Sequence, residues 1–186
     1  MSASLAFPGW TARYENTSTS QVYYDNTGLD QAIVALYDKP DLFAPIPLLQ
    51  GHFDAFLRTE TATAIHASLS QGGDIPTGIK SLHLLAEGSG GPPIVTFGGT
   101  NVPMTLVSGS RIYGETDEFA GDITAFAGSS GELQFTSPTP PSSFAYSTFD
   151  AISFSPIALP EPSSMAVAGA GLMMLMMRRR GRHVPR

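Results

Sequence analysis

The sequence predicts an all-β fold: a single β-sandwich domain followed by a short C-terminal hydrophobic helix. Short apolar runs rich in β-branched and aromatic residues recur along residues 1–156, bounded by Gly, Pro, Asn and Asp. Before residue 157, no segment has the apolar spacing of a helix longer than a turn or two. The third observation is an uncharged apolar run at 165–177 that ends in a cluster of arginines. A length of 186 residues suits one domain with an appendage.

The expected strands are spaced as in a sandwich. They cover 31–37, 52–59, 62–70, 80–86, 94–97, 104–108, 132–136 and 149–155, and residues 7–16 read as a further strand region. Residues 71–80 and 87–93 are expected to be turn-rich connectors, and 136–143 is too rich in proline for the interior of a sheet. Strict alternation along 149–155 puts odd-numbered and even-numbered residues on opposite faces, so neither face is purely apolar. Such a strand is covered partly on both sides.

The charge of the chain is unevenly distributed. Five of the ten basic residues lie in the last nine positions, whereas residues 1–159 carry fifteen acidic against five basic residues, a net charge of −10. Nucleic-acid binding requires Lys and Arg to neutralise phosphates, so the body excludes that function. The absence of cysteine excludes disulfides and thiolate metal sites.

The apolar run at 165–177 has the properties of a marginal membrane span. It contains no charged side chain, and its Ala, Leu and Met favour helix. A helix over 163–177 would be about 22 Å long against a hydrocarbon core of about 30 Å, a mismatch that snorkelling arginines and local thinning reduce. The arginines would keep the C-terminus on the cytoplasmic side, so the body would face outward. A buried core helix is the alternative, but a terminal core helix has no reason to end in arginines.

The tail therefore divides into three parts: a Pro/Ser linker at 157–164, a transmembrane helix at 165–177 and a basic cytoplasmic tail at 178–186. The prolines of the linker, Pro160 and Pro162, prevent the helix from extending back into the domain. The predicted membrane segment consists of Met165, Ala166, Val167, Ala168, Gly169, Ala170, Gly171, Leu172, Met173, Met174, Leu175, Met176 and Met177, and the basic tail of Arg178, Arg179, Arg180 and Arg182.

Three features in this order, PEPSS, an apolar stretch with GAGL, and RRRGR, resemble the PEP-CTERM sorting tail of exported proteins in bacteria that make extracellular polysaccharide. The resemblance covers about the last 27 residues. It implies removal of the tail by a membrane-embedded exosortase, with Pro160, Glu161 and Pro162 as the recognition element. The protein would then be held briefly in the inner membrane and end at the cell surface or outside the cell. The methionine-rich run departs from the usual Leu/Ala/Gly composition.

Export also requires a signal peptide, which residues 1–16 do not provide, because they lack a basic start and a continuous apolar segment. The favoured explanation is a start placed too late, so that a first strand and a signal peptide are missing. Non-standard export and a tail without function are the alternatives.

Segments of the body, among them VYYDNTGLDQAIVALYD, GDITAFAGSSGELQFT and FDAISFSP, resemble β-sandwich domains of the galactose-binding-like, jelly-roll type that often precede PEP-CTERM tails. The match covers about residues 7–155. In that pattern DITAFAG is a turn leading into the ELQFT strand. The resemblance implies a fold and no activity.

Metal binding and catalysis have little support. Glu115, Asp117, Glu118 and Asp122 are weak calcium candidates, but they lack the pattern of a calcium loop, and a solvated charged loop is the expectation. We expect no metal and no cofactor.

Three histidines, His52, His66 and His83, lack a second histidine three or four residues away, as a local zinc site would need. The sequence has no Gly-x-Ser-x-Gly elbow and no recognisable catalytic triad. Asp54 with Glu60, or Glu115 with Asp122, would form a carboxylate pair only if the fold brought them together. The expectation is that the protein is not an enzyme.

Aromatic residues near the N-terminus are the candidate ligand-binding groups. The sole tryptophan, Trp10, is expected to fill the sandwich, while Tyr23 and Tyr24 face opposite sides of an extended segment, so that at least one is exposed. Aromatic rings stack on sugars, which makes Tyr23 and Tyr24 possible carbohydrate-binding residues.

The sequence thus predicts an exported, exosortase-sorted surface or extracellular-matrix protein with a structural or adhesive role. A carbohydrate-binding module for extracellular polysaccharide is the first alternative, and a calcium-dependent hydrolase the second.

Overall fold

The computed structural model describes residues 1–25, 31–38, 49–50, 52–60, 64–108, 117–139 and 145–159. These residues form an all-β protein with two helical turns, α1 (Ala3–Ala6) and η1 (Thr124–Phe126). The strands are β1 (Thr11–Tyr14), β2 (Thr17–Thr19), β3 (Tyr23–Tyr24), β4 (Ile33–Tyr37), β5 (Asp54–Arg58), β6 (Ala67–Asp74), β7 (Ser81–Glu87), β8 (Ile94–Phe97), β9 (Thr100–Val102), β10 (Thr105–Ser108), β11 (Asp117–Asp122), β12 (Ser130–Thr136) and β13 (Tyr146–Ser155).

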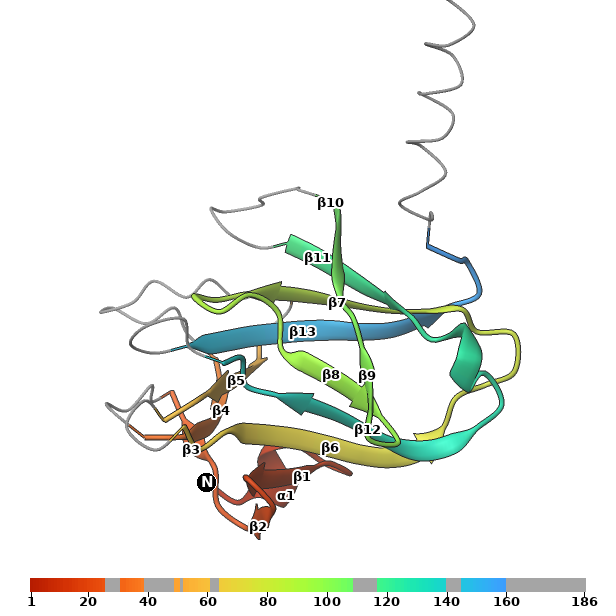
Figure 1. Cartoon of the computed structure of the whole chain (residues 1–186). Coiled ribbons are helices and arrows are strands. Elements are labelled where there is room, and N and C mark those ends of the chain that lie inside the picture. The colour runs from red at the N-terminus through yellow and green to blue at the C-terminus, as the bar shows by residue number, and fades with distance from the viewer. Residues whose placement is uncertain are drawn as a thin grey trace, which may run out of the picture.

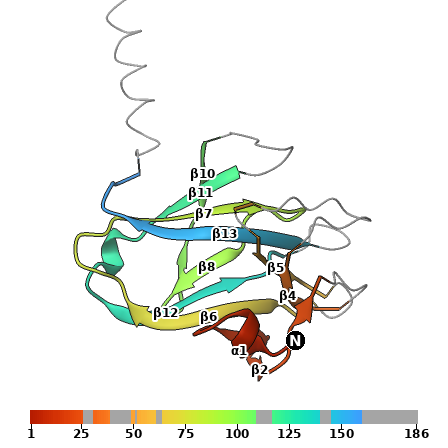
Figure 2. The same cartoon turned by 180° about the vertical axis from the view of Figure 1, so that it is seen from behind.

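The described strands form two sheets, which pack face to face as a β-sandwich (Figures 1 and 2). One sheet has six strands in the order β2-β1-β6-β12-β8-β9, and the other has seven in the order β10-β11-β7-β13-β5-β4-β3. Neighbouring strands are antiparallel except β3 and β4, which are parallel. Strand β13 lies in the middle of its sheet, between β7 and β5, and its last residues lead toward the C-terminal segment.

The main core lies between the two sheets. It is built from alternate residues of each strand, which point to the same face of a sheet. Phe135 of β12 and Phe149 of β13 join the sheets, with ring centroids 5.0 Å apart. Trp10 packs against Phe135 at a centroid distance of 5.7 Å, so the tryptophan covers the sandwich interior as its sequence position predicts.

A second apolar cluster lies on the opposite face of β4 and β5. It consists of Ile33, Ala35, Tyr37 and Phe56, all buried. Because Val34 of β4 belongs to the main core, β4 is covered on both faces, which explains its uninterrupted apolar sequence IVALY.

Most predicted strands are present. Strand β8 has the predicted bounds, and β4, β5, β7, β10, β12 and β13 agree with their predictions to within three residues at each end. The DITAFAG segment contains the helical turn η1 before β12, in agreement with its prediction as a turn. The all-β class and the sandwich are therefore confirmed for the described residues.

The prediction that 71–80 is a connector is wrong in its first part. Strand β6 begins only at Ala67 and continues through Gly72 and Gly73 to Asp74. These exposed residues pair with β12, Gly73 opposite Gly131 and Asp74 opposite Ser130. Glycine lowers strand propensity, but the hydrogen bonds to a neighbouring strand decide the conformation here.

Four strands were not predicted from the sequence: β2, β3, β9 and β11. The most important is β11, which replaces the solvated loop expected for the acidic segment. It pairs with β7 on one side and with β10 on the other. Phe119 packs against the core on one face of the strand and Ala120 is buried on the other, and this burial outweighs the charged residues at both ends of the strand.

The alternation predicted along β13 is also wrong. The register with β7 shifts between Asp150 and Ser153, which marks a β-bulge, and Ala151 has a φ of 53°. As a result both Phe149 and Ile152 pack against the main core, although strict alternation would place them on opposite faces. The extra residue lets the strand keep an apolar inner face on both sides of the bulge.

Candidate functional site

The candidate ligand-binding site is a groove at the N-terminal corner of the molecule, which we call the tyrosine groove. It has a volume of about 540 Å³. Its lining residues are Met1, Tyr14, Thr19, Gln21, Val22, Tyr23 and Tyr24. Four of them come from β1, β2 and β3 and the others lie next to these strands in the chain or at its beginning; β2 and β3 are the outer strands of the two sheets (Figure 1).

Two of the predicted aromatic residues, Tyr23 and Tyr24, form β3, the edge strand beside β4. Their side chains leave opposite faces of the strand. Tyr23 is half-buried against the second apolar cluster, whereas Tyr24 is 40% exposed. The expectation that at least one of the two is exposed therefore holds.

Both rings are held at their hydroxyl ends. The Tyr23 hydroxyl accepts a hydrogen bond from Nε2 of Gln31 at 2.8 Å, and the Tyr24 hydroxyl donates one to Oδ2 of Asp38. Asp25 lies nearby, since its Oδ1 accepts the backbone N–H of Asp38 at 2.8 Å. The hydrogen bond to Asp38 raises the pKa of Tyr24 to about 12, so this hydroxyl stays protonated over the physiological range.

Tyr14 completes the groove from β1. Its hydroxyl accepts the backbone N–H of Val34 at 3.4 Å, which ties the first sheet to β4 of the second. Burial raises the pKa of Tyr14. Thr19 and Gln21 add polar atoms at the rim: Thr19 Oγ1 donates to the Gln21 carbonyl oxygen at 3.0 Å.

This arrangement suits a flat, hydroxyl-rich ligand. Tyr24 offers an exposed ring, Tyr14 and Tyr23 line the groove with partly buried rings, and threonine and glutamine provide hydrogen-bonding groups at the rim. Rings fixed at their hydroxyl ends lose little conformational freedom on binding. The described lining residues carry no acidic or basic side chain, and the N-terminal ammonium of Met1, which also lines the groove, donates to the Val22 carbonyl oxygen at 2.9 Å.

The acidic candidates are not brought together. Glu115 lies outside the described residues, and β11 places Asp117 on the opposite face from Glu118 and Asp122. Glu118 and Asp122 are four residues apart along the strand, or about 13 Å. Asp122 Oδ1 accepts the backbone N–H of Thr124 at 2.8 Å, and the hydrogen bonds to Thr124 lower the pKa of Asp122. Asp122 therefore binds the backbone of the first residue of η1.

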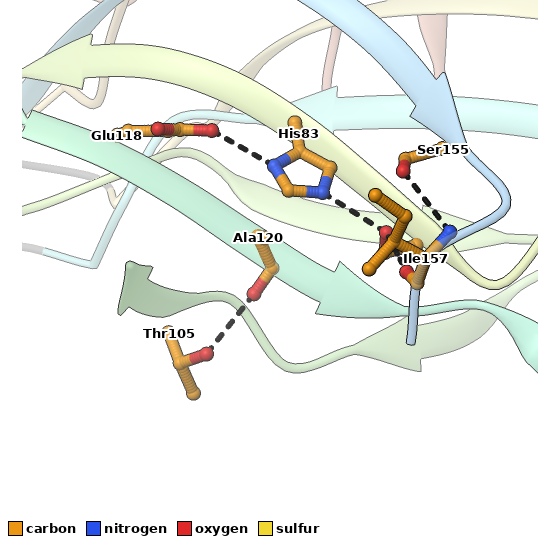
Figure 3. Close-up of polar contacts among 7 residues, drawn as sticks. His83, Thr105, Glu118, Ala120, Ser155 and Ile157 are labelled. Atoms are coloured by element: carbon orange, nitrogen blue, oxygen red, sulfur yellow. Dashed lines mark hydrogen bonds and ion pairs between the residues drawn. The ribbon is translucent and has the colours of Figure 1, made fainter. Parts of the chain in front are cut away.

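Glu118 takes part in a polar chain that the sequence did not reveal (Figure 3). Its Oε1 lies 2.9 Å from Nδ1 of His83, and Nε2 of His83 lies 2.9 Å from Oγ of Ser81. The order of groups is that of a serine-histidine-acid triad. Ser81 and His83 are two residues apart on β7 and so share a face, which is the only sequence signal for the pair.

The hydrogen-bonded series of Ser81, His83 and Glu118 lacks the exposed nucleophile that a catalytic triad needs. Ser81 is buried, and its hydroxyl donates to the carbonyl oxygen of Ile157 at 2.7 Å. The backbone N–H of Ile157 in turn donates to Ser155 Oγ at 3.1 Å (Figure 3). These hydrogen bonds thus hold the segment after β13 against β7.

The other predicted polar candidates are also separated or structural. His66 Nδ1 lies 3.1 Å from Thr59 Oγ1 and 3.0 Å from the Ser137 carbonyl oxygen, inside a hydrogen-bonded loop cluster. Asp54 is the first residue of β5 and Glu60 lies beyond its last, about 20 Å along an extended chain, so they form no carboxylate pair. Within the described ranges, no group of three or more His, Asp or Glu side chains is arranged to hold a metal ion.

The predicted sorting residues lie outside the described residues. These are Pro160, Glu161 and Pro162, the membrane segment at 165–177 and the arginines that follow. In the part of the chain that is described, no helix is long and apolar enough to cross a bilayer.

The comparisons with known proteins give no family. No protein-family profile matches the chain, and no curated protein is similar to it. Among solved structures, the enzymatically active domain of tailspike protein 4 of bacteriophage CBA120 is similar with 12% identity and a TM-score of 0.26. The match covers 81% of this chain and 18% of the tailspike chain. This likeness carries no functional conclusion.

Proposed function

We propose that this protein is an exported, exosortase-sorted surface or matrix protein whose β-sandwich adheres to extracellular polysaccharide through the tyrosine groove. The observation that carries the binding role is the groove itself. Three tyrosines line it, and the hydroxyls of all three are held by hydrogen bonds. The acidic body supports a neutral or cationic polymer as the ligand, because an anionic one would be repelled.

We further propose that the sandwich is of the galactose-binding-like, jelly-roll type. The resemblance of the strand and turn segments to such domains supports this, and so does the face-to-face packing of antiparallel sheets. Domains of this architecture have many functions, so the binding role depends on the groove and not on the fold.

The binding role is tested on an array of bacterial polysaccharides with the full chain in a detergent that contains no sugar. We expect Tyr24→Ala to weaken binding about tenfold, because the sugar rings lose an aromatic platform, whereas Tyr24→Phe keeps the ring and most of the affinity. Phe154→Ala is the matched control, since Phe154 is also 40% exposed but lies on β13, outside the groove. Equal binding by the wild type and Tyr24→Ala on every glycan that binds would refute the groove.

The sorting role is tested separately, by expression in a host that has an exosortase and in the same host without it. The proposal rests on the order of the PEP motif, the apolar run and the arginines. We expect a shortened product outside the cell only in the first host, and accumulation of the full chain when Glu161→Ala is introduced. Deletion of residues 178–186 should also stop processing. A full-length cytosolic protein in the first host contradicts the proposal and leaves the groove untouched.

A further inference from the structure

The hydrogen-bonded series that ends at Ile157 needs more hydrogen atoms than a neutral histidine supplies (Figure 3). Ser81 has a single hydroxyl hydrogen, which it donates to the Ile157 carbonyl oxygen at 2.7 Å. Ser81 Oγ can therefore only accept from Nε2 of His83, 2.9 Å away. On the other side of the ring, the carboxylate of Glu118 lies 2.9 Å from Nδ1 and also only accepts. Both ring nitrogens must carry a hydrogen, which is the cationic form of histidine.

Strand register places these side chains on one face of the seven-stranded sheet. Ser81 and His83 alternate along β7 with Leu82, which belongs to the main core, so they point away from that core. Glu118 is opposite Leu85 in the pairing of β11 with β7 and shares the same face. The side chains of His83 and Glu118 are 21% and 37% exposed, so solvent can add a proton to the ring or remove one.

The strands around the ring place further acids on this face. β11 carries Asp122, opposite Ser81, and β13 carries Asp150, whose partner in β7 is two residues from His83. On β7 itself, Glu87 lies on the same face, four residues from His83. Their negative charges favour the cationic ring, and Glu118 is the acid within hydrogen-bond distance of it. An imidazole is a stronger base than a carboxylate, so the ring carries the second proton.

We propose that Ser81, His83, Glu118 and Ile157 form a proton-operated latch on the segment that follows β13. With the ring protonated, all three contacts form and Ile157 is held against β7. When the ring loses a proton, its remaining hydrogen stays on Nδ1, since a hydrogen bond to a carboxylate is stronger than one to a hydroxyl. Nε2 then becomes an acceptor, and the hydroxyl hydrogen of Ser81 turns from the Ile157 carbonyl to the ring. Raising the pH through the range in which histidine titrates therefore releases Ile157.

Little else holds Ile157 once its carbonyl loses this donor. Its side chain is 73% exposed, and its backbone N–H donates to Oγ of Ser155 at 3.1 Å, a bond within the same short segment. Ser81 is buried in either arrangement, so its turn toward His83 does not create an accessible nucleophile.

The latch lies next to the predicted sorting motif, and its consequence for sorting rests on the proposed function. Two residues, Ala158 and Leu159, separate Ile157 from the predicted recognition element at 160–162. A protease must draw this element into its active site. Because Ser155 is the last residue of β13, release of Ile157 lengthens the unattached chain before the element. We therefore expect the released form to be the better substrate for processing.

The latch is tested by NMR of the full chain in detergent between pH 5 and pH 8.5. The readouts are the ring nitrogens of His83 and the carbonyl carbon of Ile157, whose chemical shift reports the hydrogen bond that it accepts. We expect both to change with the same midpoint. Ser81→Ala should give the released carbonyl shift at every pH.

Glu118→Gln is the decisive variant. The glutamine amide can donate to Nδ1, so a neutral ring keeps its hydrogen on Nε2 for Ser81, and the Ile157 carbonyl should keep its low-pH shift up to pH 8.5. Asp122→Asn is the matched control, because it removes a charge from the same face of β11 without touching the ring, and it should keep the pH-dependent step. Circular dichroism verifies that each variant is folded. An Ile157 shift that does not change with pH in the wild type, or a full step in folded Glu118→Gln, would overturn the latch.

The consequence for sorting is measured in the host that has an exosortase. Ser81→Ala, which cannot latch, should be processed faster than Glu118→Gln, which stays latched. Equal rates would remove the effect on sorting. Absence of processing in every chain would contradict the sorting role itself, and the NMR result would still decide the latch.

Discussion

Gly88, the residue after β7, lies directly against the main chain of Tyr146, the first residue of β13. A Cβ atom at position 88 would lie 2.1 Å from the carbonyl oxygen of Tyr146, and Gly88 has a φ of +148°. Both features require glycine, because the clash involves backbone and because side chains rarely adopt this φ. The pairing of β7 with β13, in the middle of the larger sheet, depends on this approach.

Gly88→Ala should therefore destabilise the protein strongly, by roughly 3 kcal/mol or more, since the backbone of two strands must move. Urea unfolding followed by tryptophan fluorescence measures the change. Gly73→Ala is the control: it lies on the exposed part of β6, and a Cβ added there would have no neighbour within 4 Å, so its effect should stay within about 0.5 kcal/mol. Equal stabilities of the two variants would contradict the close approach.

Asp54 should make stability depend on pH. Its folded pKa of about 6 lies above the ordinary value of 3.8, so the folded state binds the proton more tightly than the unfolded state. The stabilising effect of that proton is complete below pH 3.8 and is lost as the pH rises through 6. As the pH falls from 7 to 4, this group should raise the free energy of unfolding of the wild type by roughly 2 kcal/mol. Asp54→Asn should not show this rise, because asparagine does not titrate. Parallel stability curves for the two proteins would refute the shift.

Ser81 should not react as a nucleophile, although it is hydrogen-bonded to His83, which in turn contacts Glu118. Its hydroxyl is buried and donates to Ile157, so neither the oxygen nor its proton is available to a substrate. A fluorophosphonate probe should leave the protein unlabelled by mass spectrometry, with a known serine hydrolase as the positive control. An adduct on Ser81 would reopen the question of catalysis.

Ala151 occupies the bulge of β13 with a φ of 53°, where a side chain is unfavourable. Ala151→Gly should stabilise the protein by about 0.5–1 kcal/mol, because glycine adopts this conformation without a steric penalty. The expected rise in melting temperature is specific to the bulge, so Ala145→Gly, at a buried position before the same strand, should instead lower it. A loss of stability in Ala151→Gly would show that the Cβ of Ala151 contributes packing that exceeds the strain.

How far the strands could be predicted depends on the apolar pattern of each. IVALY in β4 and IVTF in β8 are short apolar runs bounded by turn residues, and they form strands in the predicted places. In contrast, DEFAGD and the QGGD end of β6 carry charge or glycine, and they become strands because β7 and β12 offer free hydrogen-bonding edges. The side-chain pattern of a segment does not tell which strand will lie beside it.

The candidate sites also include residues that the sequence predicts and contacts that only the structure shows. Tyr23 and Tyr24 were recognised from their chemistry, and the structure brings Tyr14, from the other sheet, to the same groove. The charge that contributes to raising the pKa of Asp54 is instead that of Asp150, almost a hundred positions away, and no local pattern predicts this. Sequence proximity suggested Glu60 as the partner, but an extended strand carries Glu60 away from Asp54.

The sequence by itself determined the all-β class, most of the strand positions and the residues able to stack on a ligand, because these depend on local alternation and side-chain chemistry. Only the tertiary structure decided which strands are neighbours, where β13 bulges and which residues line a common groove. Those features depend on backbone hydrogen bonds between distant segments, and a hydrogen bond between peptide groups is nearly independent of the side chains that the sequence specifies.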